Sequence, residues 1–277
     1  MRIDAHQHFW VVERGDYCWL TPELTALYRD FLPADLAPML ERNGIDGTVL
    51  VQAAPTVAET EFMLKLAAEN AFVKGVVGWV DFEAADARDT IMRLAQDPKL
   101  VGLRPMIHEI EDVDWMLKPA LASAFETLIA QDLTFDALTF PCHLPNLIQL
   151  LQRYPDMRVV IDHGSKPDIR GQVMAGWAED MARLAQETTC FCKVSGLVTE
   201  AAPDWTVADL KPYVDHLLAS FGPERLIWGS DWPVCTLAAT YDQWTKATDQ
   251  LFEGLHSDQI AAIRGGNAER AYNLMDL

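Results

Sequence analysis

The sequence has few basic residues. Lys and Arg together number 22 against 41 Asp and Glu, which gives a formal net charge of −19 and a pI near 4.6. Because nucleic acid is bound through a basic protein face, this balance argues against a nucleic-acid partner. An acidic surface is ordinary for a water-soluble protein, so the charge says little about a small neutral ligand.

Long apolar runs are also missing. No uncharged stretch reaches the roughly 18 residues that a membrane span needs, so we expect no membrane partner. The N-terminus shows no basic segment followed by an apolar one, because His6 and His8 interrupt the only candidate. We therefore expect no signal peptide.

The cysteines do not show the pattern of a disulfide framework. Their number is odd and their spacing irregular, and they stand at Cys18, Cys142, Cys190, Cys192 and Cys235. Such spacing suggests neither paired bridges nor a zinc ribbon. We expect reduced, mostly buried thiols in a cytoplasmic protein.

Strand-like and helical segments alternate along the whole chain. The predicted strands cover 2–8, 46–53, 73–81, 100–107, 133–140, 158–163, 190–195 and 225–231, and predicted helices separate them and fill 240–274. This alternation, without a break in composition, predicts one α/β domain over residues 1–277, a (β/α)₈ TIM barrel. A doubly wound sheet is the alternative, but it would carry a glycine-rich phosphate turn after the first strand.

The segment 9–32 interrupts the alternation early. It is rich in large aromatic side chains, with Trp10, Tyr17, Trp19 and Phe31 among them. A loop of this length and composition is more typical of a lid or a pocket wall than of a linker.

Two histidines end the first predicted strand. Side chains at i and i+2 of a strand point the same way, so His6 and His8 project together. Two imidazoles placed like this hold a divalent metal or orient a substrate. A chance pair of surface histidines is the alternative.

Further polar residues follow the other predicted strands. Active sites of (β/α)₈ barrels form at the carboxyl ends of the strands. The polar residues found there are Gln52, Asp81, Arg104, His108, His143, Asp162, His163, Lys193, Ser195 and Asp231. Five of the seven histidines lie at or near strand ends, which points to one shared site.

Several of these residues also have an ordinary structural explanation. Asp81 is placed to cap the following helix, and Asp162 to hold a backbone amide. Arg104 serves either an ion pair or an oxygen near the site, and Lys193 is able to neutralise acidic neighbours. For Asp231 we favour function, because Gly229 permits close backbone approach and Pro233 ends the strand.

The motifs together resemble a known family. The sequence motifs that carry the resemblance are Asp4-Ala-His-Gln-His-Phe-Trp10, Val77-Gly-Trp-Val-Asp81, Asp162-His-Gly-Ser-Lys-Pro167, Lys193-Val-Ser-Gly-Leu197 and Gly229-Ser-Asp-Trp-Pro-Val-Cys235. In this order they resemble the amidohydrolase superfamily, and within it the sugar lactone hydrolases of the fuconolactonase and rhamnonolactonase type.

The resemblance implies a somewhat distorted TIM barrel that opens the lactone of an aldonic acid. It implies at most one metal, because the lysine that bridges two metals in other members is missing and Arg104 stands on the fourth strand. That metal is a divalent ion such as Zn²⁺ on His6, His8, His163 and Asp231, although some members of the branch work without one.

Roles for single residues follow from the same resemblance. Asp231 acts as the general base on a water, with His163 beside it, and Arg104 or a metal stabilises the developing oxyanion. The residues expected to bind the sugar lactone are His143, Lys193, Trp19 and Asp81.

Two alternatives remain open. A related enzyme acting on a dicarboxylate lactone or an aromatic acid would need several basic groups, which Arg104, Lys193 and Lys166 would supply. A barrel that only binds a sugar or a metal is the other. The sequence is compatible with a homo-oligomer and does not specify the oligomeric state.

Overall fold

Eight parallel strands form one sheet in the computed structural model, which describes residues 1–274. Each strand pairs with the next in sequence order. They are β1 (Ile3–Gln7), β2 (Gly47–Val51), β3 (Val73–Gly78), β4 (Leu100–Leu103), β5 (Thr134–Ala137), β6 (Val159–Ile161), β7 (Phe191–Val194) and β8 (Leu226–Trp228). The predicted (β/α)₈ barrel is confirmed.

The barrel closes less regularly between its first and last strands. No ladder joins β1 to β8 among the described residues; instead Gln7 forms one bridge with Trp232, just after β8. The backbone amide of His8 donates to the Trp232 carbonyl at 2.7 Å. This seam is the distortion in the barrel, and it joins the two sequence motifs that carry His6, His8 and Asp231.

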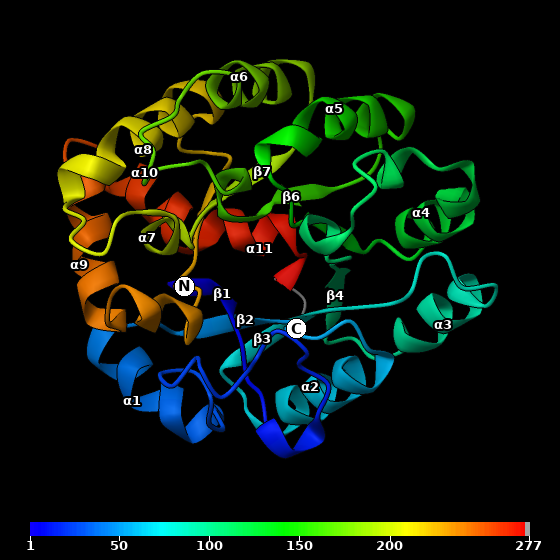
Figure 1. Cartoon of the computed structure of the whole chain (residues 1–277). Coiled ribbons are helices and arrows are strands. Elements are labelled where there is room, and N and C mark those ends of the chain that lie inside the picture. Colours follow the sequence, from blue (N-terminus) through cyan, green and yellow to red (C-terminus); the bar gives the residue numbers. More distant parts are fainter. Residues whose placement is uncertain (275–277) are drawn as a thin grey trace.

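Most of the helices surround the strands as an outer ring, whereas α11 lies across the centre (Figure 1). They are α1 (Pro33–Asn43), α2 (Val57–Glu69), α3 (Ala87–Leu94), α4 (Ala122–Ala130), α5 (Leu144–Arg153), α6 (Trp177–Glu187), α7 (Leu197–Glu200), α8 (Val207–Phe221), α9 (Tyr241–Leu251), α10 (Ser257–Ala261) and α11 (Asn267–Ala271). Among the described residues, no helix is long and apolar enough to cross a membrane.

The observed strands end earlier than the sequence predicts. The fourth predicted strand ran to residue 107, but β4 stops at Leu103, because Pro105 has no amide hydrogen to continue a ladder. The residues beyond such ends form the loops that face the site.

The last short helix, α11, closes the amino-terminal end of the barrel. Ala268, Ala271 and Tyr272 pack with interior residues of the strands, such as Ile3 and Val49. The carbonyl of Ala271 accepts a hydrogen bond from the Thr134 hydroxyl, at the start of β5. Figure 1 shows α11 lying across the centre of the ring of helices.

The aromatic loop 9–32 packs against the other end of the barrel. Trp10 is fully buried and pairs through its backbone with Phe31. The indole of Trp19 donates to the Ala53 carbonyl at 2.7 Å, in the loop after β2. The loop is therefore folded onto the strand ends, as expected for a pocket wall.

Candidate active site

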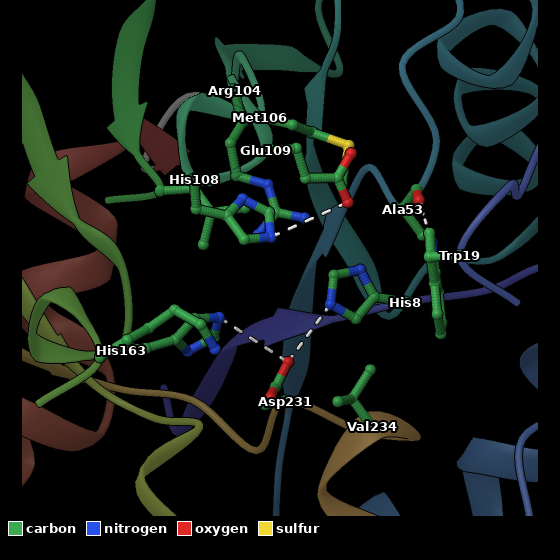
Figure 2. A pocket seen from close by; sticks show the side chains of 12 residues that line it. His8, Trp19, Ala53, Arg104, Met106, His108, Glu109, His163, Asp231 and Val234 are labelled. Carbon is green, nitrogen blue, oxygen red and sulfur yellow. Dashed lines mark hydrogen bonds and ion pairs between the residues drawn. The ribbon is translucent and has the colours of Figure 1, made fainter. Parts of the chain in front are cut away.

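A cavity of about 220 Å³ opens at the carboxyl ends of the strands. Figure 2 shows the side chains around it, which come from loops after most of the strands. They are His8, Trp19, Ala53, Arg104, Met106, His108, Glu109, Leu138, His163, Lys166, Asp231 and Val234. The cavity is smaller than the ~300–1,000 Å³ of typical drug-sized pockets, so it suits a small ligand.

Asp231 is held at the seam by backbone contacts. Its amide donates to the His6 carbonyl at 2.8 Å, and the preceding amide, that of Ser230, donates to Asp4 Oδ1 at 2.7 Å. A Cβ at Gly229 would lie 2.7 Å from that of His6, so only glycine allows this approach of β8 to β1. The turn places the Asp231 carboxylate over the end of β1.

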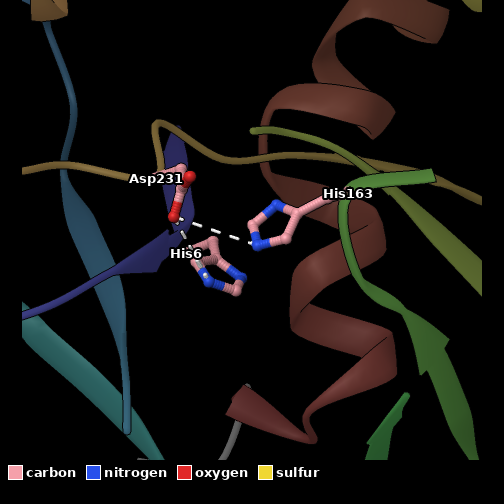
Figure 3. Close-up of side chains that lie close together, drawn as sticks. All are labelled: His6, His163 and Asp231. Carbon is pink, nitrogen blue, oxygen red and sulfur yellow. Dashed lines mark ion pairs between the residues drawn. The ribbon is translucent and has the colours of Figure 1, made fainter. Parts of the chain in front are cut away.

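Three imidazoles converge on one oxygen of Asp231. Its Oδ1 lies 3.3 Å from Nε2 of His8, 3.7 Å from Nε2 of His6 and 3.9 Å from Nε2 of His163. Figure 3 shows the rings of His6 and His163 both close to this carboxylate. The structure thus brings together four residues that the sequence analysis assigned to one site.

The other ring nitrogens fix how these imidazoles point. His8 Nδ1 lies 2.8 Å from the Val51 carbonyl, which only accepts, so Nδ1 carries the hydrogen. His163 Nδ1 contacts the Ser195 hydroxyl at 2.9 Å. Gly196, at φ +63°, leaves room for this ring, since a Cβ there would lie 2.5 Å from Nδ1. Each Nε2 is thereby aimed at Asp231.

This donor set fits one divalent cation. Ligand atoms of His6, His163 and Asp231 all lie within 4.8 Å of one another, and the three residues are buried. The neutral His8 ring would present a lone pair to a carboxylate oxygen, a contact that needs a proton or a cation to be favourable. Two or three imidazoles with a carboxylate are ligands that Zn²⁺ takes, with a position left open.

The ionisation of the site follows from burial and from its neighbours. Burial lowers the pKa of His163 to about 4, so this ring is neutral at pH 7. Burial alone would raise the pKa of Asp231, but the neighbouring imidazoles, His163 above all, outweigh burial and lower this pKa. The site at neutral pH therefore contains an ionised carboxylate beside a neutral imidazole.

Arg104 forms part of the cavity wall with its guanidinium held in place. Nη1 lies 3.1 Å from Asp162 Oδ2 and 3.3 Å from His6 Nε2. Nη2 donates to the side-chain and backbone oxygens of Gln52. A guanidinium fixed in this way is preorganised to stabilise negative charge that develops nearby.

Lys193 does not reach the cavity, contrary to the prediction that it binds the sugar. It is fully buried, and its Nζ lies 2.6 Å from Asp136, 2.9 Å from Asp162 and 3.1 Å from Nδ1 of His6. On β7 it precedes the strand-end Ser195 by two residues, so it points inward one layer deeper in the barrel.

His143 and Asp81 do not line this cavity either, so the structure does not bring them to the Asp231 site with the other predicted residues. The buried ring of His143 accepts a hydrogen bond from the Phe140 amide and so caps its own turn. Asp81 is exposed, and its carboxylate accepts from the Glu83 amide at 2.9 Å. This contact holds the turn after β3; it does not cap the following helix, because α3 begins at Ala87.

Several cavity residues were not assigned to the site from the sequence. Glu109 follows β4, Leu138 follows β5, and Val234 follows β8. Their only sequence signal is their position just beyond a predicted strand. Trp19 does line the cavity, as expected for the aromatic loop.

Comparison with known proteins covers almost the whole chain. The amidohydrolase family model matches residues 3–274. An L-fucono-1,5-lactonase of Burkholderia ambifaria is 44% identical, over 99% of this chain and 96% of its own length, and another from Burkholderia multivorans is 35% identical over the same shares. A crystal structure of a Burkholderia multivorans amidohydrolase with bound zinc superimposes with a TM-score of 0.93 at 34% identity, covering 99% of both chains.

Proposed function

The chain belongs to the amidohydrolase family, and on that premise we propose that it hydrolyses sugar lactones of the L-fucono-1,5-lactone kind to aldonic acids. The observation that carries the proposal is the convergence of three imidazole Nε2 atoms on Asp231 Oδ1 in the cavity. The two full-length lactonase relatives support the same substrate class.

Asp231 is the general base in this proposal. Its lowered pKa keeps the carboxylate ionised at neutral pH, so it accepts a proton from a water between it and the lactone. The water oxygen forms a bond to the lactone carbonyl carbon. The bond from that carbon to the ring oxygen then breaks, and Asp231 returns its proton to the ring oxygen that leaves.

Arg104 stabilises the oxyanion formed by the attack. Its guanidinium lines the cavity and is fixed by Asp162 and Gln52, so it needs no reorganisation when charge develops. Lactones are activated esters, and a modest electrostatic contribution is sufficient for them. His8 and His163 orient the water and the Asp231 carboxylate.

The residues that would hold a divalent ion are His6, His163 and Asp231, with His8 beside them. When bound, such an ion supplies Lewis-acid polarisation of the carbonyl and a more acidic water. The zinc in the Burkholderia multivorans relative supports Zn²⁺ as the candidate.

The remaining wall of the cavity suits a sugar ring. Trp19 offers an aromatic face held by its bond to Ala53, and Met106, Leu138 and Val234 are apolar. His108 adds a polar edge for hydroxyl groups. We propose that these side chains cover the lactone while its carbonyl faces Asp231.

Proton release on adding aldonolactones of different ring size tests the function. We expect turnover of L-fucono-1,5-lactone well above the spontaneous rate, and no proton release above background would refute the proposal. Zinc titration by calorimetry, after dialysis against a chelator, tests the metal independently. We expect binding of one ion, weakened at least tenfold in His6→Gln.

A cytoplasmic location and a homo-oligomer stay predictions.

A further inference from the structure

The cations that line the cavity are already neutralised by carboxylates behind them. Lys166 forms an ion pair with Glu200, at the end of α7. Arg104 pairs with Asp162 at 3.1 Å. The third basic residue that the sequence offered for an anionic substrate, Lys193, lies below the cavity with Asp136 and Asp162. None of these three charges is left over for a second carboxylate on a ligand.

Glu109 adds a negative charge to the same wall, and among the described residues no Lys or Arg forms an ion pair with it. Nε2 of His108 lies 3.9 Å from its Oε1, and the carboxylate is 42% exposed. Burial and the nearby Arg104 lower the pKa of His108 to about 3, so this ring is neutral and offers no compensating charge. Figure 2 shows Glu109 beside His108 and Met106, across the view from Asp231.

We propose that Glu109 determines substrate charge: it selects neutral sugar lactones against lactones that carry a carboxylate. This inference rests on the proposed lactonase function and names the substrate class more narrowly. A deoxy sugar lactone has a methyl group at the carbon where an aldarolactone of the same ring has a carboxylate. In this cavity that carboxylate meets Glu109, while the two cations of the described lining, Arg104 and Lys166, are already paired.

The same charge favours release of the product. Ring opening converts a neutral lactone into an aldonate anion and a proton, so the ligand becomes negative only after the reaction. Like charges within a partly dehydrated cavity repel more strongly than in bulk water. A cation on His6, His163 and Asp231 would change the charge at the carbonyl end and would leave Glu109 uncompensated.

The test compares two substrates on each of several variants. The substrates are L-fucono-1,5-lactone and an aldarolactone of matched ring size, and the readout is the ratio of their kcat/KM values after subtraction of spontaneous hydrolysis. In Glu109→Gln we expect the ratio of carboxylated to neutral lactone to rise about tenfold, the effect of roughly one like-charge contact. Glu126→Gln, an exposed carboxylate on α4, removes the same charge far from the cavity and should leave the ratio within twofold.

A second variant changes the charge of the cavity wall by freeing a cation there, with Glu109 left in place. Glu200→Gln removes the partner of Lys166 and frees a positive charge at the cavity wall, so it should raise the ratio as well. Both effects should shrink in 1 M salt, because the Debye length falls to about 3 Å and charges farther apart are screened from one another.

The outcomes separate this inference from the proposed function. Wild-type turnover of the neutral lactone tests the function alone. An unchanged ratio in Glu109→Gln, a loss of both activities in equal proportion, or a wild-type preference for the aldarolactone would each overturn the role of Glu109. A measured ratio is insensitive to a variant that folds only in part, because both substrates report on the same folded fraction.

Discussion

Two layers of ionisable side chains fill the middle of the barrel, and they differ in access. The upper layer, made of His8, His163, Arg104 and Asp231, lines the cavity. The lower layer, made of Lys193, Asp136, Asp162 and Tyr272, lies beneath it and is almost fully shielded from solvent. His6 joins the layers, since its Nδ1 faces Lys193 and its Nε2 faces Asp231.

The two layers differ in depth and not in residue type. Both layers contain carboxylates and cations at strand ends. In the lower layer each charge has its partner, because Lys193 bridges Asp136 and Asp162, and Arg104 reaches down to Asp162. In the upper layer Asp231 has no full cationic partner among the described residues, so its charge is available to a water or a metal.

The largest effect is expected from Asp231→Asn. The amide cannot take a proton from water, so kcat should fall by a factor on the order of 10²–10⁴. Lactone-dependent proton release measures it, and circular dichroism checks that the fold is retained. Near wild-type turnover in this variant would remove Asp231 from the chemistry and abolish the distinction between the layers.

Lys193→Met tests the lower layer. Removing the ammonium leaves Asp136 and Asp162 buried with fewer partners, so the free energy of unfolding should drop by about 3–5 kcal/mol. Urea unfolding measures this change. Lys211→Met is the matched control, because Lys211 pairs with Asp215 on the exposed surface and should cost at most about 1 kcal/mol. Equal losses in the two variants would contradict a special role for the buried layer.

Tyr272→Phe tests whether the Tyr272 hydroxyl belongs to the stabilising network of the lower layer. The Tyr272 hydroxyl donates to Asp136 at 2.8 and 3.0 Å, and a bond to a buried carboxylate contributes roughly 1.5–3 kcal/mol. We expect a loss of that size in the free energy of unfolding, measured by urea. Tyr28→Phe, at an exposed position, should change it by less than about 0.5 kcal/mol. No difference between these variants would place Tyr272 outside the network.

The smallest effect is expected from Asp81→Asn. Asparagine still caps the Glu83 amide, and the side chain lies outside the cavity, so kcat/KM for the lactone should stay within about twofold. Steady-state kinetics measure this ratio. A tenfold loss would restore Asp81 to the substrate-binding residues and show that exposure alone does not exclude a role.

The sequence predicted the barrel because buried parallel strands and amphipathic helices leave a local pattern. It also placed His6, His8, His163 and Asp231 together, since the carboxyl ends of parallel strands share one face of the barrel.

The depth of a side chain within the barrel leaves no comparable local pattern in the sequence. Lys193 in β7 and Ser195 directly after it are both buried, and only the closed barrel separates their layers. The sequence likewise gave no indication that Glu200 would neutralise Lys166, because that pair joins residues 34 positions apart.

The position of α11 bears on how the protein is made. The apolar strand faces around Ile3, Val49 and Val160 are covered by Ala268, Ala271 and Tyr272, which are synthesised after all eight strands. During translation the inner face of the barrel therefore stays accessible until these residues arrive. Chains that stop before residue 267 would expose that surface and become targets for chaperones and proteases, so burial of this face depends on the residues of α11 and Tyr272.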